Sequence, residues 1–181
     1  MKKYIILAVL VGLCVCGAWF AITNKSNLNH DSKWLTYTHE ADPSLSFSYP
    51  ETFGQPRIVD QADKDGRKFQ VDFGDYRFSV NNGYYFLDVD GKRPAVTQLL
   101  QGYEKDKEAK NEVRDFTVKE IRVANRPATE VDIDNLNGTH YTDVYVYNGD
   151  KTTTDFILIT VDRSFVNESL LERILTSFKL R

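Results

Sequence analysis

Hydrophobic and polar positions divide the chain into an apolar leader, a short polar stretch, and a long remainder in which the two kinds of residue alternate. Residues 4–22 carry no charge, and as a helix rising about 1.5 Å per residue they would reach roughly 28 Å. The hydrocarbon core of a bilayer is about 30 Å thick, so one transmembrane span is predicted. Because Lys2 and Lys3 precede it, residues 1–3 are expected to stay in the cytoplasm and the C-terminal part to lie outside.

The leader has three alternative fates. A signal anchor retained in the cell membrane, single-pass and N-in/C-out, is favoured by the length of the run and by Trp19, since amphipathic rings prefer the membrane interface. Cleavage after Ala18, where small residues form a weak cleavage site, would instead secrete the chain. A lipoprotein is disfavoured because neither Cys14 nor Cys16 follows a small residue.

After a polar linker at residues 23–33, residues 34–181 show the period-two alternation that is typical of β-strands. The Asn-Gly pair at 82–83 indicates a tight turn, and a second pair at 148–149 lies in a connection that residues 151–154 would lengthen beyond two residues. Residues 156–159 are apolar at consecutive positions, which predicts a central strand covered on both faces. The predicted strands are residues 34–39, 45–49, 68–73, 76–80, 84–89, 116–123, 128–133, 141–147 and 155–161, with the pair 116–123 and 128–133 joined around residues 125–127.

Two helices are expected to flank these strands. Pro94 suits a first helical turn, and apolar residues follow it with helical spacing at Val96, Leu99, Leu100 and Tyr103. Asn167 can cap a second helix, and its apolar stripe comprises Leu170, Leu171, Ile174, Leu175 and Phe178. Strands and helices do not alternate, so the fold class is α+β, a mostly antiparallel β-sheet flanked by helices, at residues 34–181.

The arrangement resembles the Mog1/PsbP-like α/β/α sandwich over about residues 34–181. The matching features are Trp34-x-x-Tyr37, Leu45-Ser46-Phe47-Ser48-Tyr49-Pro50, the helix after Pro94, and Leu171-x-x-Ile174-Leu175-x-Ser177-Phe178. Members of that family range from extrinsic proteins of photosystems to a protein that binds a small GTPase. The resemblance implies an accessory or binding domain without catalytic residues, and it carries over no site residue.

Charge and cysteine content narrow the classes of partner. The formal net charge is −3, and the leader contributes two lysines, so the remainder carries −5. This acidic balance disfavours binding to nucleic acid and electrostatic binding to anionic lipid, because both kinds of binding favour basic surface patches. No cysteine follows Cys16, so the domain contains no disulfide and depends on its core.

The sequence predicts no catalytic residues and no cofactor, and hence not an enzyme. A Ser-His-Asp site needs a histidine oriented by a carboxylate, but on a strand His140 and Asp143 would face opposite sides. Phosphate and dinucleotide loops are missing from the sequence. Gln61–Asp72 resembles a calcium-binding loop incompletely, as do residues 132–138 and 88–91. Such acid-and-glycine clusters more often form turns, so no metal ligand is predicted.

Five tyrosines form the candidate interaction surface. Tyr84 and Tyr85 follow the turn at 82–83, while Tyr141, Tyr145 and Tyr147 share one strand face. Exposed, they would anchor an interface; alternatively they pack under a helix, with their hydroxyls at its rim. The expected function is non-catalytic binding or assembly support for an envelope protein partner. The alternative is a secreted or anchored module that binds a small ligand or cation.

Overall fold

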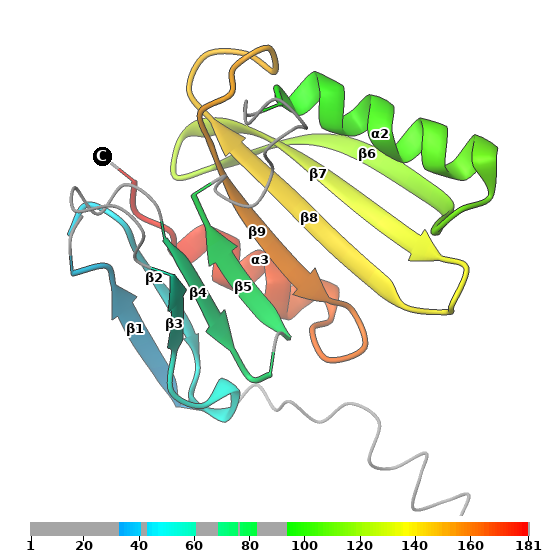
Figure 1. Cartoon of the computed structure of the whole chain (residues 1–181). Helices are drawn as coiled ribbons and strands as arrows, with labels where there is room; N and C mark the ends of the chain where they lie inside the picture. The colour runs from blue at the N-terminus through cyan, green and yellow to red at the C-terminus, as the bar shows by residue number, and fades with distance from the viewer. Residues whose placement is uncertain (1–32, 41–42, 61–68, 76, 83–93, 181) are drawn as a thin grey trace, which may run out of the picture. The chain divides into compact units, whose positions relative to one another are not determined.

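The computed structural model describes residues 33–40, 43–60, 69–75, 77–82 and 94–180 (Figure 1). Residues from 33 onward form one compact unit. The predicted span at residues 4–22 and the linker lie outside the described residues, as does the strand expected at 84–89. Within the described part of the chain, every helix is too short or too polar to cross a membrane.

Among the described residues, seven strands form one antiparallel sheet in which β9 is central. The consecutive apolar residues of β9 are covered on both faces, as its pattern predicted. In sheet order the strands are β3 (Arg57–Asp60), β4 (Gln70–Phe73), β5 (Phe78–Asn81), β9 (Phe156–Asp162), β8 (His140–Tyr147), β7 (Arg126–Asn135) and β6 (Val113–Val123).

Helix α2 (Val96–Ala109) covers one face of the sheet over β6 to β9 (Figure 1). The predicted stripe is confirmed: Val96, Leu99, Leu100 and Tyr103 pack on a buried cluster from that face. The sheet residues of this cluster are Val113, Val131, Ile133, Tyr145, Tyr147, Phe156 and Leu158.

Helix α3 (Glu168–Ser177) lies on the other face, together with a hairpin of β1 (Trp34–Thr38) and β2 (Ser46–Pro50). The side chain of Asn167 accepts a hydrogen bond from the Leu170 amide at 2.9 Å, which confirms the predicted cap. Leu171, Ile174 and Leu175 are buried as expected. A short 3-10 turn, η1 (Glu51–Phe53), follows β2.

Two of the four sequence features that suggested the family resemblance meet in space. The ring of Phe178 stacks on Phe47, with centroids 4.7 Å apart and planes 14° apart. Ser177 Oγ accepts a hydrogen bond from the Ser48 amide at 2.8 Å, and Lys179 pairs with Ser46 through two backbone bonds. The end of the chain therefore fastens the hairpin to α3.

Several predicted boundaries are corrected. Strand β3 was not expected, because its four residues carry no clear alternation. The turn between β6 and β7 consists of Ala124 and Asn125, both with positive φ, and not of residues 125–127. Two left-handed residues suit the twist of a two-residue hairpin, so Arg126 and Pro127 already belong to β7.

Candidate functional site

A groove of about 610 Å³ separates α3 from the outer strands β6 and β7. One side is formed by α3 and Phe178, and the other by β6, β7 and the turn that joins them. The lining residues are Lys119, Ile121, Arg122, Ala124, Asn125, Glu130, Glu168, Leu171, Glu172, Leu175, Thr176 and Phe178.

Strand register and helix spacing place these side chains in the groove. Lys119 pairs with Glu130 across β6 and β7, and Ile121 pairs with Ala128, so all four occupy one sheet face. That face is opposite to Val131 and the other residues under α2. Along α3, Glu168, Glu172 and Thr176 follow one another four residues apart and therefore form one edge of the helix.

Glu130 is the central charged group of the groove. Its exposed fraction is 6%, and the nearest cation, Lys119 Nζ, lies 3.8 Å from its Oε1 atom. Burial raises the pKa of Glu130 above its ordinary value; Lys119 opposes this effect, and the carboxylates of Asp132 and Glu168 add to it. A further positive group in the groove would therefore stabilise the ionised carboxylate.

Two cations near the groove each have a bonding partner. Arg163 Nη2 lies 2.6 Å from Glu168 Oε2, and Arg122 donates to the backbone oxygen of Asn125. Of the residues that the structure describes, three glutamates and two cations line the groove. The charges of these lining side chains sum to −1, which the ion pair of Glu168 with Arg163 offsets. Leucine, isoleucine and phenylalanine side chains form the apolar part of the lining.

A second polar cluster lies on the opposite face, between α2 and the sheet. Asp143 accepts hydrogen bonds from Tyr103 at 2.6 Å and Thr160 at 2.7 Å, and a longer one from Tyr145 at 3.4 Å. Burial raises the pKa of Asp143, which these hydrogen bonds partly oppose. Burial, aided by the Asp143 charge, also raises the pKa of the Tyr103 hydroxyl. This cluster joins a helix to the sheet, and its tyrosines remain protonated donors.

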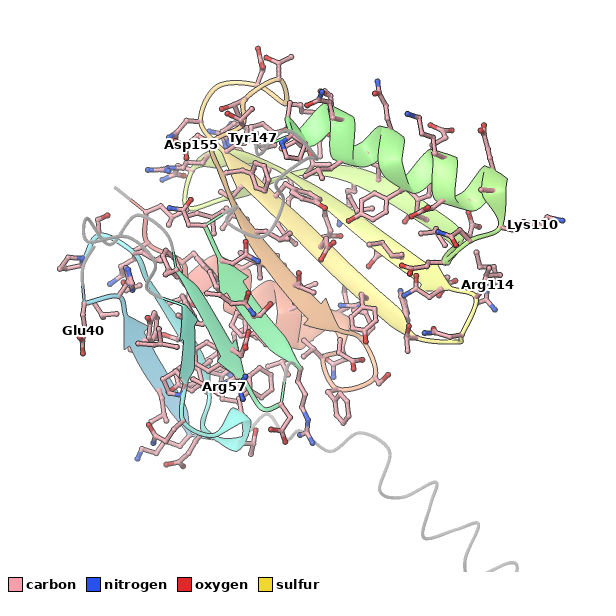
Figure 2. All side chains as sticks on the ribbon, viewed as in Figure 1. Glu40, Arg57, Lys110, Arg114, Tyr147 and Asp155 are labelled. Atoms are coloured by element: carbon pink, nitrogen blue, oxygen red, sulfur yellow. The ribbon has the colours of Figure 1, made fainter. Side chains whose placement is uncertain are left out.

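The predicted tyrosine surface needs correction. Tyr145 and Tyr147 are 0% and 2% exposed because α2 covers their face (Figure 2). The hydroxyl of Tyr147 bonds to Thr129 at 3.0 Å, in keeping with the alternative that these rings pack under a helix. Tyr141 is partly exposed. Tyr84 and Tyr85 lie outside the described residues, and their interaction role stays a prediction.

Some acidic segments partly resemble calcium-binding loops. In the described part of the chain, their carboxylates do not converge on one point. Asp132 Oδ1 accepts from Thr142 at 2.5 Å, and Asp134 pairs with Arg114 at 3.4 Å, so both bond to neighbouring strands. Among the described residues, no group of three His, Cys, Asp or Glu side chains is placed to hold a metal ion. Residues 61–68 and 88–91 lie outside them.

Sequence reasoning overlooked Glu130, although a signal was present. Glu130 and Asp132 alternate with Thr129, Val131 and Ile133 along β7, so one face of this strand is acidic while the other is mostly apolar. Such alternation predicts that a helix such as α2 covers the apolar face only. It cannot predict that α3 leaves Glu130 at the bottom of a groove.

Comparisons with known proteins identify a likeness of fold. No family model matches the chain, and no curated protein matches it in sequence. It is similar to the solution structure of cyanobacterial PsbP (CyanoP) from Synechocystis sp. PCC 6803, with a TM-score of 0.44 and 11% identity. The match covers 86% of this chain and 96% of that one. The sequence resemblance named the same fold group, and the likeness concerns the fold alone.

Proposed function

We propose that the protein is a membrane-anchored, extracytoplasmic and non-catalytic binding or assembly module. Its groove between α3 and β6–β7 binds an extended, basic segment of an envelope protein. The anchor is the apolar segment at residues 4–22. The observation that carries the binding role is Glu130, a buried carboxylate that lines an open groove and is only partly compensated by Lys119 at 3.8 Å.

The groove suits a lysine or arginine side chain of the partner. The aliphatic stem of such a side chain can pack on Ile121, Leu171 and Leu175 while its charged end reaches Glu130. Glu172 adds a negative charge along the α3 side, whereas Glu168 is already paired with Arg163. A charged pair that is largely removed from water contributes to specificity, because a neutral or acidic segment leaves Glu130 compensated only in part, by Lys119.

Strand β6 supports an extended conformation for the bound segment. It is eleven residues long, lies at one edge of the sheet and pairs with β7 on its inner side. Within the described ranges no strand pairs with its outer side. An extended peptide can add to such an edge through main-chain hydrogen bonds while its side chains enter adjacent pockets.

Acid–base catalysis is a weaker interpretation of the same groove. A raised pKa suits a general acid, but catalysis also needs a nucleophile or a second acid or base within hydrogen-bond reach. Among the described residues, the charged groups that act on Glu130 are Asp132, Glu168, Lys119 and Arg163. Among these groups, the Glu130 carboxylate is better suited to binding a further cation than to transferring a proton.

Site-specific photocrosslinking tests the proposed groove. A photoreactive p-benzoylphenylalanine replaces Thr176, which is exposed and lines the groove. The matched control carries it at Asp155, which is exposed on the loop between β8 and β9 and does not line the groove. We expect one envelope protein to crosslink from position 176 alone, through a segment containing Lys or Arg, as mapped by mass spectrometry.

The variant Glu130→Gln should reduce that crosslink several-fold because it removes the negative charge at the base of the groove. Identical partners from positions 176 and 155 would contradict the proposal, as would a crosslinked segment without basic residues. The anchor has its own test, the intact mass of the protein from its own membranes. A chain that still contains residues 1–18 supports retention, and one that begins after Ala18 supports secretion.

A further inference from the structure

The edge of the sheet at β6 is open along the middle of the strand. The strand has eleven residues, about twice the usual length, and pairs with β7 on its inner side. Thr117 and Lys119 are exposed on one face of the sheet, and Val118 and Glu120 are exposed on the other. No described element therefore covers this part of the edge, and a further strand has room to pair with it.

The turn at the end of β6 shows which of its main-chain groups point outward. Because two residues form that turn, the main-chain groups of Val123, the last residue of β6, point toward β7. The direction then alternates along an antiparallel strand, and no bulge interrupts the pairing between residues 115 and 123. The N–H and C=O groups of Phe116, Val118 and Glu120 therefore point away from β7, toward the open side.

Charged side chains on an edge strand usually oppose pairing with another strand, but those of β6 complement one another. We infer that β6 pairs antiparallel with β6 of a second copy of this chain, about a two-fold axis at Thr117. This register places Asp115 opposite Lys119 of the second copy, and Lys119 opposite its Asp115. Residues directly opposite in an antiparallel pair share one face, where opposite charges attract.

The same register covers exposed apolar surface. Val118 is 44% exposed, and Phe116 on the same face is partly exposed. In the dimer Phe116 lies opposite Val118 of the second copy, and the two-fold axis repeats this pair. An aromatic ring beside a β-branched side chain is a favourable cross-strand pair. Both residues direct their main-chain groups outward, so each pair exchanges two main-chain hydrogen bonds.

Neighbouring registers are disfavoured by charge. A two-fold axis normal to the sheet keeps each side chain on its own face, so the register can shift only in steps of two residues. An axis at Val118 would place Arg114 opposite Arg122 of the second copy. An axis at Lys119 would place the two copies of Lys119 opposite each other. Like charges directly opposite are destabilising, so the register centred on Thr117 is preferred.

The dimer occupies the edge that the proposed partner segment would use. Self-pairing and binding of the segment therefore exclude each other, and the second copy would keep the edge closed until a partner displaces it. This consequence rests on the proposed function, whereas the dimer itself does not.

Cysteine crosslinking of the full chain in mild detergent tests the register. Cys14 and Cys16 are replaced by Ala, and Thr117→Cys then supplies the one cysteine. Its two copies at the axis have Cα atoms about 4.5 Å apart, within the range that a disulfide spans. We expect mild oxidation to produce a covalent dimer. The matched control Arg122→Cys, exposed on the same strand, should stay monomeric because its two copies lie roughly 30 Å apart.

Exchange of charges tests the pairing, with light scattering of the full chain across a dilution series as the measurement. Lys119→Glu and Asp115→Lys each place like charges opposite one another, and each should weaken the dimer several-fold. The double variant restores opposite charges and should restore the dimer, a rescue that a loss of folding would not give. The control Glu40→Lys reverses an exposed charge far from Arg114 and should leave the dimer unchanged (Figure 2).

Three results would overturn the inference. They are a chain that scatters as a monomer at every concentration, a crosslink from Arg122→Cys as strong as that from Thr117→Cys, and a double charge variant that pairs no better than the single variants. Photocrosslinking from position 176 tests the groove separately. A monomeric chain that still crosslinks an envelope protein there would remove the dimer alone, and a dimer without such a crosslink would remove the proposed function alone.

Discussion

The hydroxyl of Tyr103, on α2, lies 2.6 Å from Oδ2 of Asp143, on β8. The same hydroxyl lies 2.6 Å from that of Tyr145. Around these atoms the interface between α2 and the sheet is apolar. The bond therefore holds the helix at a defined position, because a shift of α2 would leave a buried carboxylate without one of its donors.

Substitution of Tyr103 by Phe should lower the free energy of unfolding by about 1–3 kcal/mol, because it leaves the Asp143 carboxylate short of a donor. Urea unfolding followed by circular dichroism measures this loss. The control is Tyr141→Phe, which removes the same atom from a partly exposed ring. The double variant Tyr103→Phe with Asp143→Asn should lose less unfolding free energy than the sum of the two single losses. Strictly additive losses would show that the hydrogen bond does not couple the two residues.

Substitution of Ser177 by Ala tests how the C-terminal segment holds the β1–β2 hairpin. Its hydroxyl accepts from the Ser48 amide at 2.8 Å and donates to the Ile174 carbonyl at 2.6 Å. We expect a loss of about 1 kcal/mol in unfolding free energy, and faster hydrogen exchange of the Ser48 amide. Thr176→Ala, which alters an exposed hydroxyl bonded within its own helix, should change neither. Equal exchange rates at Ser48 would contradict this role.

The N-cap of α3 provides a third prediction. Substitution of Asn167 by Ala removes the acceptor for the Leu170 amide and should destabilise the protein by about 1 kcal/mol. Asn167→Asp keeps an acceptor and adds a negative charge at the helix N-terminus, so its stability should match or exceed that of the native chain. Thermal unfolding of the three proteins distinguishes these outcomes, and equal losses in both variants would exclude capping as the cause.

The raised pKa of Glu130 predicts a pH-dependent effect. A carboxyl group whose pKa is higher in the folded state binds its proton more tightly there, so its ionisation reduces stability as pH rises through the folded pKa. Glu130→Gln should therefore be more stable than the native chain at pH 7, by about 1–3 °C in Tm. This advantage should disappear as pH falls below the usual glutamate value of 4.5.

Glu172→Gln, on the exposed side of the groove, is the control for that experiment and should show no such crossover. A Glu130→Gln variant that is less stable than the native chain at pH 7 would show that attraction to Lys119 exceeds the cost of burial. In that case the groove would not need a cationic partner, and the proposed function would lose its main support.

The elements that depend on local pattern were predictable from the sequence. Alternating residues placed most strands to within a few residues, and the apolar run at 156–159 identified the central strand. Helical spacing and Asn167 located α3, because a cap and its buried stripe involve residues within a few turns of one another. The four residues of β3 carry no such signal, since their pairing depends on β4 and not on their own alternation.

The candidate sites depended on tertiary structure. The sequence by itself determined that Glu130 shares a strand face with Ala128 and that Asp72 lies in a strand, since side chains alternate along any strand. Only the folded chain decided that α3 leaves a groove beside Glu130, that α2 buries Tyr145 and Tyr147, and that Asp72 Oδ2 is buried without a partner. Burial and charge compensation arise from residues distant in sequence, so no local pattern encodes them.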